Sequence, residues 1–317
     1  MAEVIRNSYD IIFFVQAKLC NPNGDPDMGN LPRTDPVTNI GYITDVCLKR
    51  RIRDYVDSAF EGEDGNDIMV RASSNINEAL DSCIEEKPDG VSPIGYVCAK
   101  YFDARTFGAT LTGGLNGGQI LGPVQIWPTM SVDPVETEDI TIDCVAVRKT
   151  AEEFAKLTED KKRTFGRKQF VQYGLYPVYV SISAGPAQKV GFTDVDLDVM
   201  LESICNLYSD VSASKAGMTI VGPVIIFKHV GTDNGSEKAK ARQCAKGCIK
   251  RQDLHDLVKI ERIDKDKPAR DYKDYTLEIN KSCGLLEKAG VELMFKYQPF
   301  EEPVTEVASY DTWTKII

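Results

Sequence analysis

Positions 49–53 contain four basic residues, and three of them, Lys49, Arg50 and Arg53, carry charge that could bind phosphate groups together. If residues 44–60 form a helix with 100° between successive residues, these cations lie together on its polar face. The adjoining apolar face would comprise Leu48, Ile52, Tyr55 and Val56. The pattern indicates a phosphate-binding surface, and the alternative is a solvated helix face of the kind that most basic runs form.

The preceding residues must deliver the chain to this helix. Residues 21–36 read N-P-N-G-D-P-D-M-G-N-L-P-R-T-D-P, and their prolines, glycines and asparagines specify turns and extended backbone. Thr44 is a natural N-cap, and Asp45 follows in the first turn, where the helix dipole favours a negative charge. We therefore predict a long loop and then a helix that ends near Phe60, with a cationic stripe on its exposed side.

Carboxylates in the same loop offer a second kind of chemistry. Asp25, Asp27 and Asp35 could supply oxygen ligands to a divalent ion. Aspartates beside proline and glycine more commonly form turns, and we favour that interpretation. We therefore predict no catalytic residue in this loop.

The cysteines do not form a metal-binding pattern. Cys244, Cys248 and His255 lack a fourth ligand and the second close pair that zinc sites usually contain. Nine cysteines without regular spacing are typical of free thiols in a reducing cytosol. The apolar run at residues 11–15 is too short for a signal peptide, and no run is long enough to span a membrane. We predict a cytoplasmic protein with no metal, no cofactor and no membrane partner.

Composition limits the possible partners. The chain has 317 residues and a formal net charge of −10, with 42% hydrophobic and 27% charged residues. Such a charge argues against indiscriminate nucleic-acid binding, because the far field repels phosphate. A local cationic groove remains compatible with it.

The periodicity predicts an α+β fold. We expect helices over residues 44–60, 193–208 and about 238–251, with a weakly helical pattern over 68–83. We expect strands over residues 10–19, 94–107, 123–127, 172–184, 218–229, 257–263, 275–280 and 291–297. Without insertions the order is strand, helix, strand, strand, helix, strand. That is the ferredoxin-like order that RNA-recognition (RRM-like) folds share.

A second basic segment follows an alternating one. Residues 140–148 alternate between apolar and polar side chains, which favours a β arm. Five cations follow it closely: Lys161, Lys162, Arg163, Arg167 and Lys168. This pattern predicts a protruding hairpin with a basic arm, and the alternative is a disordered basic loop.

The loop and first helix together resemble a family signature. The backbone subunit of type I-C CRISPR surveillance complexes (Cascade), in the RAMP superfamily, carries N-P-N-G-D-P-D-x-G-N-x-P-R and then D-V-x-x-K-R-x-I-R. Residues 21–33 and 45–53 match these two motifs. The resemblance covers most of the chain and includes residues 103–108, 122–126, 164–176, 192–197 and 228–229.

The resemblance implies a hand-like organisation. Residues 1–60 would begin a ferredoxin-like palm, 61–93 would form inserted fingers, and 94–130 would continue the palm. Residues 131–168 would form a β-hairpin thumb, and 169–317 would complete the palm and add a C-terminal extension.

The resemblance also implies a non-catalytic function. Several copies would polymerise as a helical filament along one CRISPR RNA and present it for pairing with target DNA, beside other Cascade subunits in an antiviral ribonucleoprotein. The expected RNA contacts are Lys49, Arg50, Arg53, Asn21, Asn23, Arg33, Lys161, Lys162, Arg163, Arg167, Lys168 and Lys215. Lys215 stands where the family tends to carry arginine, whose bidentate fork a lysine cannot reproduce.

Two other functions stay open. Related backbone subunits of type III complexes cut RNA with an aspartate of the corresponding loop, which makes a metal-dependent endoribonuclease the alternative. A metabolic enzyme rests only on the glycine-rich residues 108–122, which match neither G-x-G-x-x-G nor the P-loop.

Overall fold

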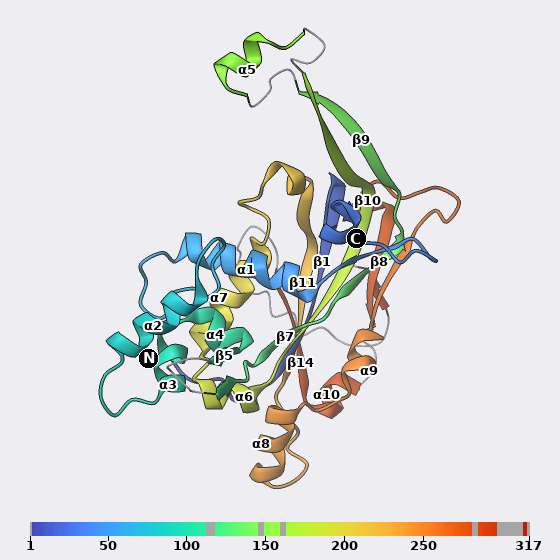
Figure 1. Ribbon diagram of the computed structural model, residues 1–317. Helices are drawn as coiled ribbons and strands as arrows, with labels where there is room; N and C mark the ends of the chain where they lie inside the picture. The colour runs from blue at the N-terminus through green and yellow to red at the C-terminus, as the bar shows by residue number, and fades with distance from the viewer. Residues whose placement is uncertain are drawn as a thin grey trace.

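An antiparallel sheet forms the centre of this mixed α/β structure (Figure 1). The computed structural model describes residues 2–111, 118–144, 149–158, 163–280, 285–296 and 313–315. The strands lie in the order β14 (Val291–Lys296), β11 (Met218–His229), β1 (Tyr9–Cys20), β10 (Thr164–Ile182) and β7 (Val124–Ile126). Every neighbouring pair is antiparallel. The strands predicted over residues 10–19, 172–184, 218–229 and 291–297 are confirmed in this sheet.

The central strand is buried on both faces. Ile11, Phe13 and Val15 of β1 belong to one apolar cluster, whereas Ile12 and Phe14 belong to another on the opposite face. A strand covered on both sides reads as a continuous apolar run, which explains why its sequence does not alternate.

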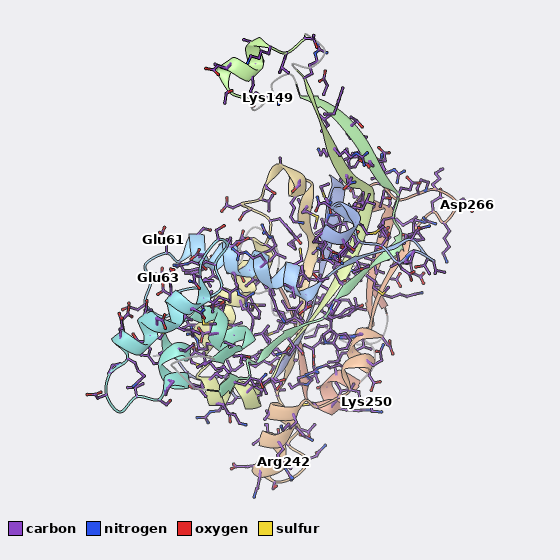
Figure 2. The ribbon with its side chains drawn as sticks, viewed as in Figure 1. Glu61, Glu63, Lys149, Arg242, Lys250 and Asp266 are labelled. Carbon is purple, nitrogen blue, oxygen red and sulfur yellow. The ribbon has the colours of Figure 1, made fainter. Side chains whose placement is uncertain are left out.

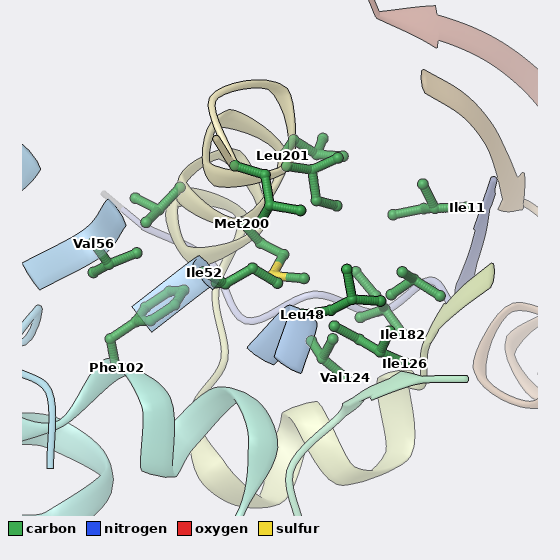
Figure 3. Packing of buried hydrophobic residues seen from close by; sticks show 14 of the residues in the cluster. Ile11, Leu48, Ile52, Val56, Phe102, Val124, Ile126, Ile182, Met200 and Leu201 are labelled. Atoms are coloured by element: carbon green, nitrogen blue, oxygen red, sulfur yellow. The ribbon is translucent and has the colours of Figure 1, made fainter. Parts of the chain in front are cut away.

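Two helices cover the first face. α1 (Asp45–Ala59) and α7 (Asp194–Cys205) confirm the predicted helices, and Thr44 and Thr193 cap them as expected. Thr193 and Asp196 form a capping box. The two helices pack through an apolar layer against the sheet (Figure 3). This layer includes Leu48, Ile52, Val56, Met200 and Leu201.

The opposite face is covered by the C-terminal half of the chain. The covering elements are β12 (Val258–Arg262), β13 (Tyr275–Asn280), α9 (Arg251–His255) and α10 (Leu285–Ala289), whereas α8 (Glu237–Lys246) projects at one end of the sheet (Figure 1). β12 and β13 pair antiparallel, and β15 (Trp313–Lys315) joins them. The predicted helix over residues 238–251 is two helices, because Gly247 ends α8 at a φ of +96°.

Residues 94–107 are helical, so the predicted second strand is wrong. They form α3 (Pro93–Lys100) and α4 (Phe102–Phe107). Ser92 caps α3 by accepting a hydrogen bond from the backbone N–H of Gly95, and Pro93 lies at the first helical position, which favours a helix start. The strand assignment failed because the apolar run is short and its buried spacing is helical. With α2 (Ile76–Glu86), these helices form an insertion beside α1 (Figure 1).

The predicted hairpin is present, with a later start than expected. β9 (Thr137–Cys144) pairs with the first part of β10, and this arm projects from the body towards α5 (Ala151–Ala155) (Figure 1). Residues 131–134 lie outside the arm. They belong to β8 (Thr129–Pro134), which pairs with β4 (Ile40–Ile43) in the body.

The remaining short elements lie in connections. β2 (Gly24–Asp25) and β3 (Leu31–Pro32) pair within the first loop, and β5 (Ala109–Leu111) pairs with β6 (Gly118–Ile120). α6 (Ala184–Val190) follows β10. No helix among the described residues is both long and apolar enough to cross a membrane.

Candidate nucleic-acid interface

The loop before α1 is held in one conformation by its own polar groups. The Asn23 side-chain oxygen accepts hydrogen bonds from the backbone N–H of Thr44 (2.9 Å) and from its hydroxyl (3.0 Å). The Asn21 side-chain amide donates to the carbonyl oxygen of Asn30 (2.8 Å). Both asparagines were expected to contact RNA, and the structure uses their side chains to join the loop to itself and to the helix start.

Lys215 fixes the beginning of the same loop. Its ammonium donates to the carbonyl oxygens of Asn21 (3.0 Å) and Pro22 (2.6 Å). Burial lowers the pKa of Lys215, because the charged form loses hydration there. The structure therefore places this cation beneath the loop, where it bonds to backbone.

The loop aspartates act as turn residues. Asp25 accepts a hydrogen bond from the backbone N–H of Asp27 and lies 3.1 Å from a guanidinium nitrogen of Arg33. Asp35 accepts from the backbone N–H of Val37 (2.8 Å). Hydrogen bonds from that N–H and from the Thr38 hydroxyl lower the pKa of Asp35. This is the turn-forming interpretation that the sequence favoured for Asp25 and Asp35.

The residues considered for zinc do not converge. Cys248 directs its thiol to the carbonyl oxygens of Gln243 and Gly290, whereas the His255 ring packs 4.1 Å from the ring of Tyr179 between centroids. Within the described part of the chain, no three His, Cys, Asp or Glu side chains are arranged to hold a metal ion.

The cations of α1 are close together but largely covered. The side chains of Lys49, Arg50 and Arg53 are only 17, 29 and 13% exposed, and each pairs with a carboxylate of this chain. Lys49 lies 2.9 Å from Asp45. The prediction that these cations lie on the exposed side of the helix is therefore wrong, because the helices of the insertion lie beside α1 and cover them.

Asp103 explains why Arg53 is covered. This carboxylate is 1% exposed and accepts hydrogen bonds from Arg53 Nε (2.8 Å) and from the backbone N–H groups of Met69 (2.8 Å) and Val70 (3.1 Å). Arg50 also donates to the Val70 carbonyl oxygen (3.2 Å). Asp103 therefore joins α1 to the insertion, a role that the family-like segment of residues 103–108 did not reveal in the sequence.

A second buried ion pair in that segment holds the insertion to α7. Arg105 donates through Nε (3.1 Å) and through a terminal nitrogen (2.6 Å) to the two carboxylate oxygens of Asp196. Two parallel bonds of this kind fix both position and orientation. Arg105 is therefore a buried structural residue, which fixes α4 of the insertion against α7.

The hairpin presents the most exposed of the predicted contacts. Arg163 and Arg167 are 61 and 76% exposed, although they lie 3.1 and 3.7 Å from the carboxylates of Asp143 and Asp139 on β9. Lys168 is also exposed on the arm. Exposed ion pairs of this kind contribute little to stability, so these arginines can leave their carboxylate partners and bind a phosphate. Lys161 and Lys162 lie outside the described residues.

An exposed aromatic ring accompanies these cations. Phe165 lies two residues before Arg167 on β10, so both side chains project from the same face of the arm. Phe165 is among the exposed large apolar side chains of the protein. A ring beside arginines can stack on an unpaired base, and the basic run around an aromatic residue was the sequence signal that we overlooked.

By its fold, this chain is an α/β protein built on an antiparallel sheet with a projecting hairpin. A family model described as CRISPR-associated protein Cas7 matches residues 7–280. The chain belongs to that family, and the family resemblance seen in the sequence is thereby confirmed.

A curated relative and two solved structures are similar to the chain. CRISPR-associated protein Cas7 of Haloferax volcanii is 29% identical over 227 residues, and the match covers 63% of each chain. The chain thus spans less than two thirds of that relative. One structure, titled "CRISPR RNA-guided surveillance complex, pre-nicking", has 16% identity and a TM-score of 0.46 over 73% of this chain and 80% of its own. Another, "CRISPR RNA-guided surveillance complex", has 17% identity and a TM-score of 0.44 over 75% of each chain.

Proposed function

We propose that this chain is a non-catalytic backbone subunit of a CRISPR surveillance complex of the type I-C kind. Several copies polymerise along one guide RNA, beside other subunits of the complex, and present its bases for pairing with target DNA in the cytoplasm. The observation that carries this proposal is the family match, because it spans residues 7–280 and thus includes the loop, α1 and the hairpin.

We assign the parts of the proposed hand from the topology. The palm is a ferredoxin-like domain, because β1, α1, β7, β10, α7 and β11 follow in that order along the chain and the strands lie as β11-β1-β10-β7. The insertion that contains α2, α3 and α4 forms the fingers. The thumb is the β9–β10 arm, which begins at Thr137 because residues 131–134 pair within the body.

The proposed RNA contacts fall into two groups. The hairpin supplies the principal phosphate contacts through Arg163, Arg167 and Lys168, with Lys161 and Lys162 in the same segment. Their support is exposure, since a cation must reach solvent to meet a phosphate. Lys49, Arg50 and Arg53 of α1 form the second group of RNA contacts. They bind phosphate through the N–H groups that do not bond to their carboxylate partners.

The loop before α1 is proposed to shape the RNA groove. Asn21, Asn23, Arg33 and Lys215 hold its backbone in place, which fixes the groups that the loop presents.

Protein purified from its native operon tests the proposed function. We expect bound RNA, visible as a raised ratio of absorbance at 260 nm to that at 280 nm, whose sequence matches spacers of a repeat–spacer array. RNA of unrelated sequence, or protein that binds no RNA after expression beside its array, would contradict the proposal.

The enzymatic alternative predicts that RNA complementary to the guide is cut, whereas the non-catalytic proposal predicts that it is not. We expect RNA complementary to the guide to stay intact with the complex in magnesium or manganese, because Asp25 and Asp35 serve turns in the loop. Gel electrophoresis of the end-labelled RNA gives the readout. Regularly spaced cuts that disappear in Asp25→Ala, Asp27→Ala or Asp35→Ala would favour the endoribonuclease.

A further inference from the structure

A second concentration of positive charge lies far along the chain from the hairpin. Residues 238–251 contain six cations and no acidic residue, although the protein carries a net charge of −10. These cations are Lys238, Lys240, Arg242, Lys246, Lys250 and Arg251. They belong to α8, to α9 and to the connection between the two helices.

Three of the cations form a row on α8. Lys238, Arg242 and Lys246 are spaced by four residues, so they lie along one side of the helix, and all three are exposed. Among the described residues, none of the three makes an ion pair or a side-chain hydrogen bond, whereas Lys240 lies 2.5 Å from Asp233. Like charges at this spacing destabilise a helix, so folding alone does not account for the row.

This arrangement differs from that of α1. Lys49, Arg50 and Arg53 each have a carboxylate of the same chain within 3 Å. The row on α8 therefore offers positive charge that the protein itself does not neutralise.

The row leads into a cavity of about 780 Å³. Lys246 lies at the end of α8 and lines the cavity, and Lys250 and Arg251 line it from the start of α9. The described residues provide no ion-pair partner for Lys250. The walls also contain Asp10, Asp253 and residues 247–249.

Buried polar groups fix the wall of this cavity. The carboxylate of Asp10 lies 2.9 Å from Nε2 of His229 and accepts a hydrogen bond from Arg251 Nε (3.0 Å). His229 Nδ1 accepts from the backbone N–H of Cys248 (3.0 Å). The negative charge of Asp10 is therefore offset by Arg251, and the connection between the helices is held rigidly.

The site lies at the opposite end of the molecule from the hairpin. α8 projects from one end of the sheet and the β9–β10 arm from the other (Figure 1). Arg242 and Lys250 lie at the α8 end, whereas Lys149 lies at the tip of the arm (Figure 2). A strand held by the hairpin and a ligand held by α8 therefore occupy different surfaces.

We infer that the α8 row and its cavity bind the phosphodiester backbone of a second nucleic-acid strand. One phosphate enters the cavity between Lys246 and Lys250, and the neighbouring phosphates lie along Arg242 and Lys238. Four helical residues rise about 6 Å, so the row is about 12 Å long and fits a polyanion better than a single small anion. Binding is independent of sequence, because the row offers only charge to the phosphates.

Binding of labelled DNA of unrelated sequence tests this inference. The purified protein, with any RNA that it carries, is titrated with a 30-nucleotide single strand and separately with the corresponding duplex over a range of salt concentrations. The test variant is Lys238→Gln, Arg242→Gln and Lys246→Gln. The matched control is Lys265→Gln, Lys267→Gln and Lys273→Gln, which removes three exposed cations near β12 and β13.

The test variant is expected to lose salt-dependent affinity. The slope of log affinity against log salt should fall by about 2 for the single strand and by about 3 for the duplex, if that is the form bound. At 0.1 M salt this corresponds to a loss on the order of 100-fold for the single strand and on the order of 1000-fold for the duplex. The control should keep the slope and affinity of the unchanged protein, and the RNA content of both variants should stay the same.

Three results would overturn the inference. Unchanged slopes in the test variant, an equal loss in the control, or binding only to vesicles of anionic phospholipid would each do so. If the triple variant does not fold, the single variants Lys238→Gln and Arg242→Gln decide the question, each with an expected slope change of about 0.7 for a single strand. A retained RNA content with unchanged DNA binding would reject this inference and leave the proposed function standing.

Discussion

Replacing residues 139–169 with a two-residue Asn-Gly turn is expected to leave the monomer folded and to abolish ordered assembly on guide RNA. Glu138 and Phe170 are direct partners across the arm, so a tight turn can join them. No described residue of β9 belongs to either of the two large apolar clusters. The deletion therefore removes exposed β structure and the proposed phosphate contacts together.

Native mass measurement and nuclease protection provide the readouts. The shortened protein with guide RNA should give isolated or irregularly bound subunits, and nuclease should digest RNA that the intact assembly protects. A control that replaces residues 264–267 between β12 and β13 with Asn-Gly should assemble normally. Normal stoichiometry and protection in the shortened protein would show that the arm is not the thumb.

Arg53→Ala is expected to lower the free energy of unfolding by about 3 kcal/mol. The substitution leaves the carboxylate of Asp103, which is 1% exposed, without its guanidinium partner. Breaking a covered ion pair from one side destabilises strongly, because the remaining carboxylate loses its counter-charge and keeps only its hydrogen bonds from the backbone N–H groups of Met69 and Val70. Urea unfolding followed by circular dichroism gives the measurement.

Lys49→Ala is the matched control on the same helix. Its partner Asp45 is half-buried at the start of α1, so the pair should contribute below about 1 kcal/mol. Equal losses in the two variants would contradict the structural role assigned to Asp103. Charge reversal at Arg53 is therefore not a suitable test of RNA binding, because the substitution would also destabilise the fold.

Local signals predicted the loop and the first helix well. Thr44, Asp45 and the proline-rich run before them act through neighbouring backbone, so their effect can be read from adjacent residues. The same holds for the β arm, whose alternation of apolar and polar side chains indicates a strand, although Ile140 and Ile142 prove to be exposed. Residues 94–107 were misassigned because a short apolar run fits both a buried strand and a helix.

Contacts between distant residues could not be read in this way. The helical wheel placed Lys49, Arg50 and Arg53 together, but it could not show that Asp103, fifty positions further on, covers Arg53. The start of the arm was misplaced for the same reason, because β8 pairs with β4 from a remote part of the chain.

The α8 row shows what part of a candidate site a sequence reveals. Its spacing is visible in the printed sequence, because Lys238, Arg242 and Lys246 are four residues apart. The cavity beside it is lined in part by Asp10 of β1 and His229 of β11, which are far from α8 and α9 in the sequence. Only the folded chain places these groups together.

The number of subunits bound to guides of different length tests the proposed function most directly. Protein is assembled with two guide RNAs whose spacer regions differ in length, and each complex is weighed by native mass spectrometry. A backbone subunit predicts that the longer guide binds more copies, in proportion to the added length. The same number of copies on both guides would contradict polymerisation along the RNA and with it the central proposal.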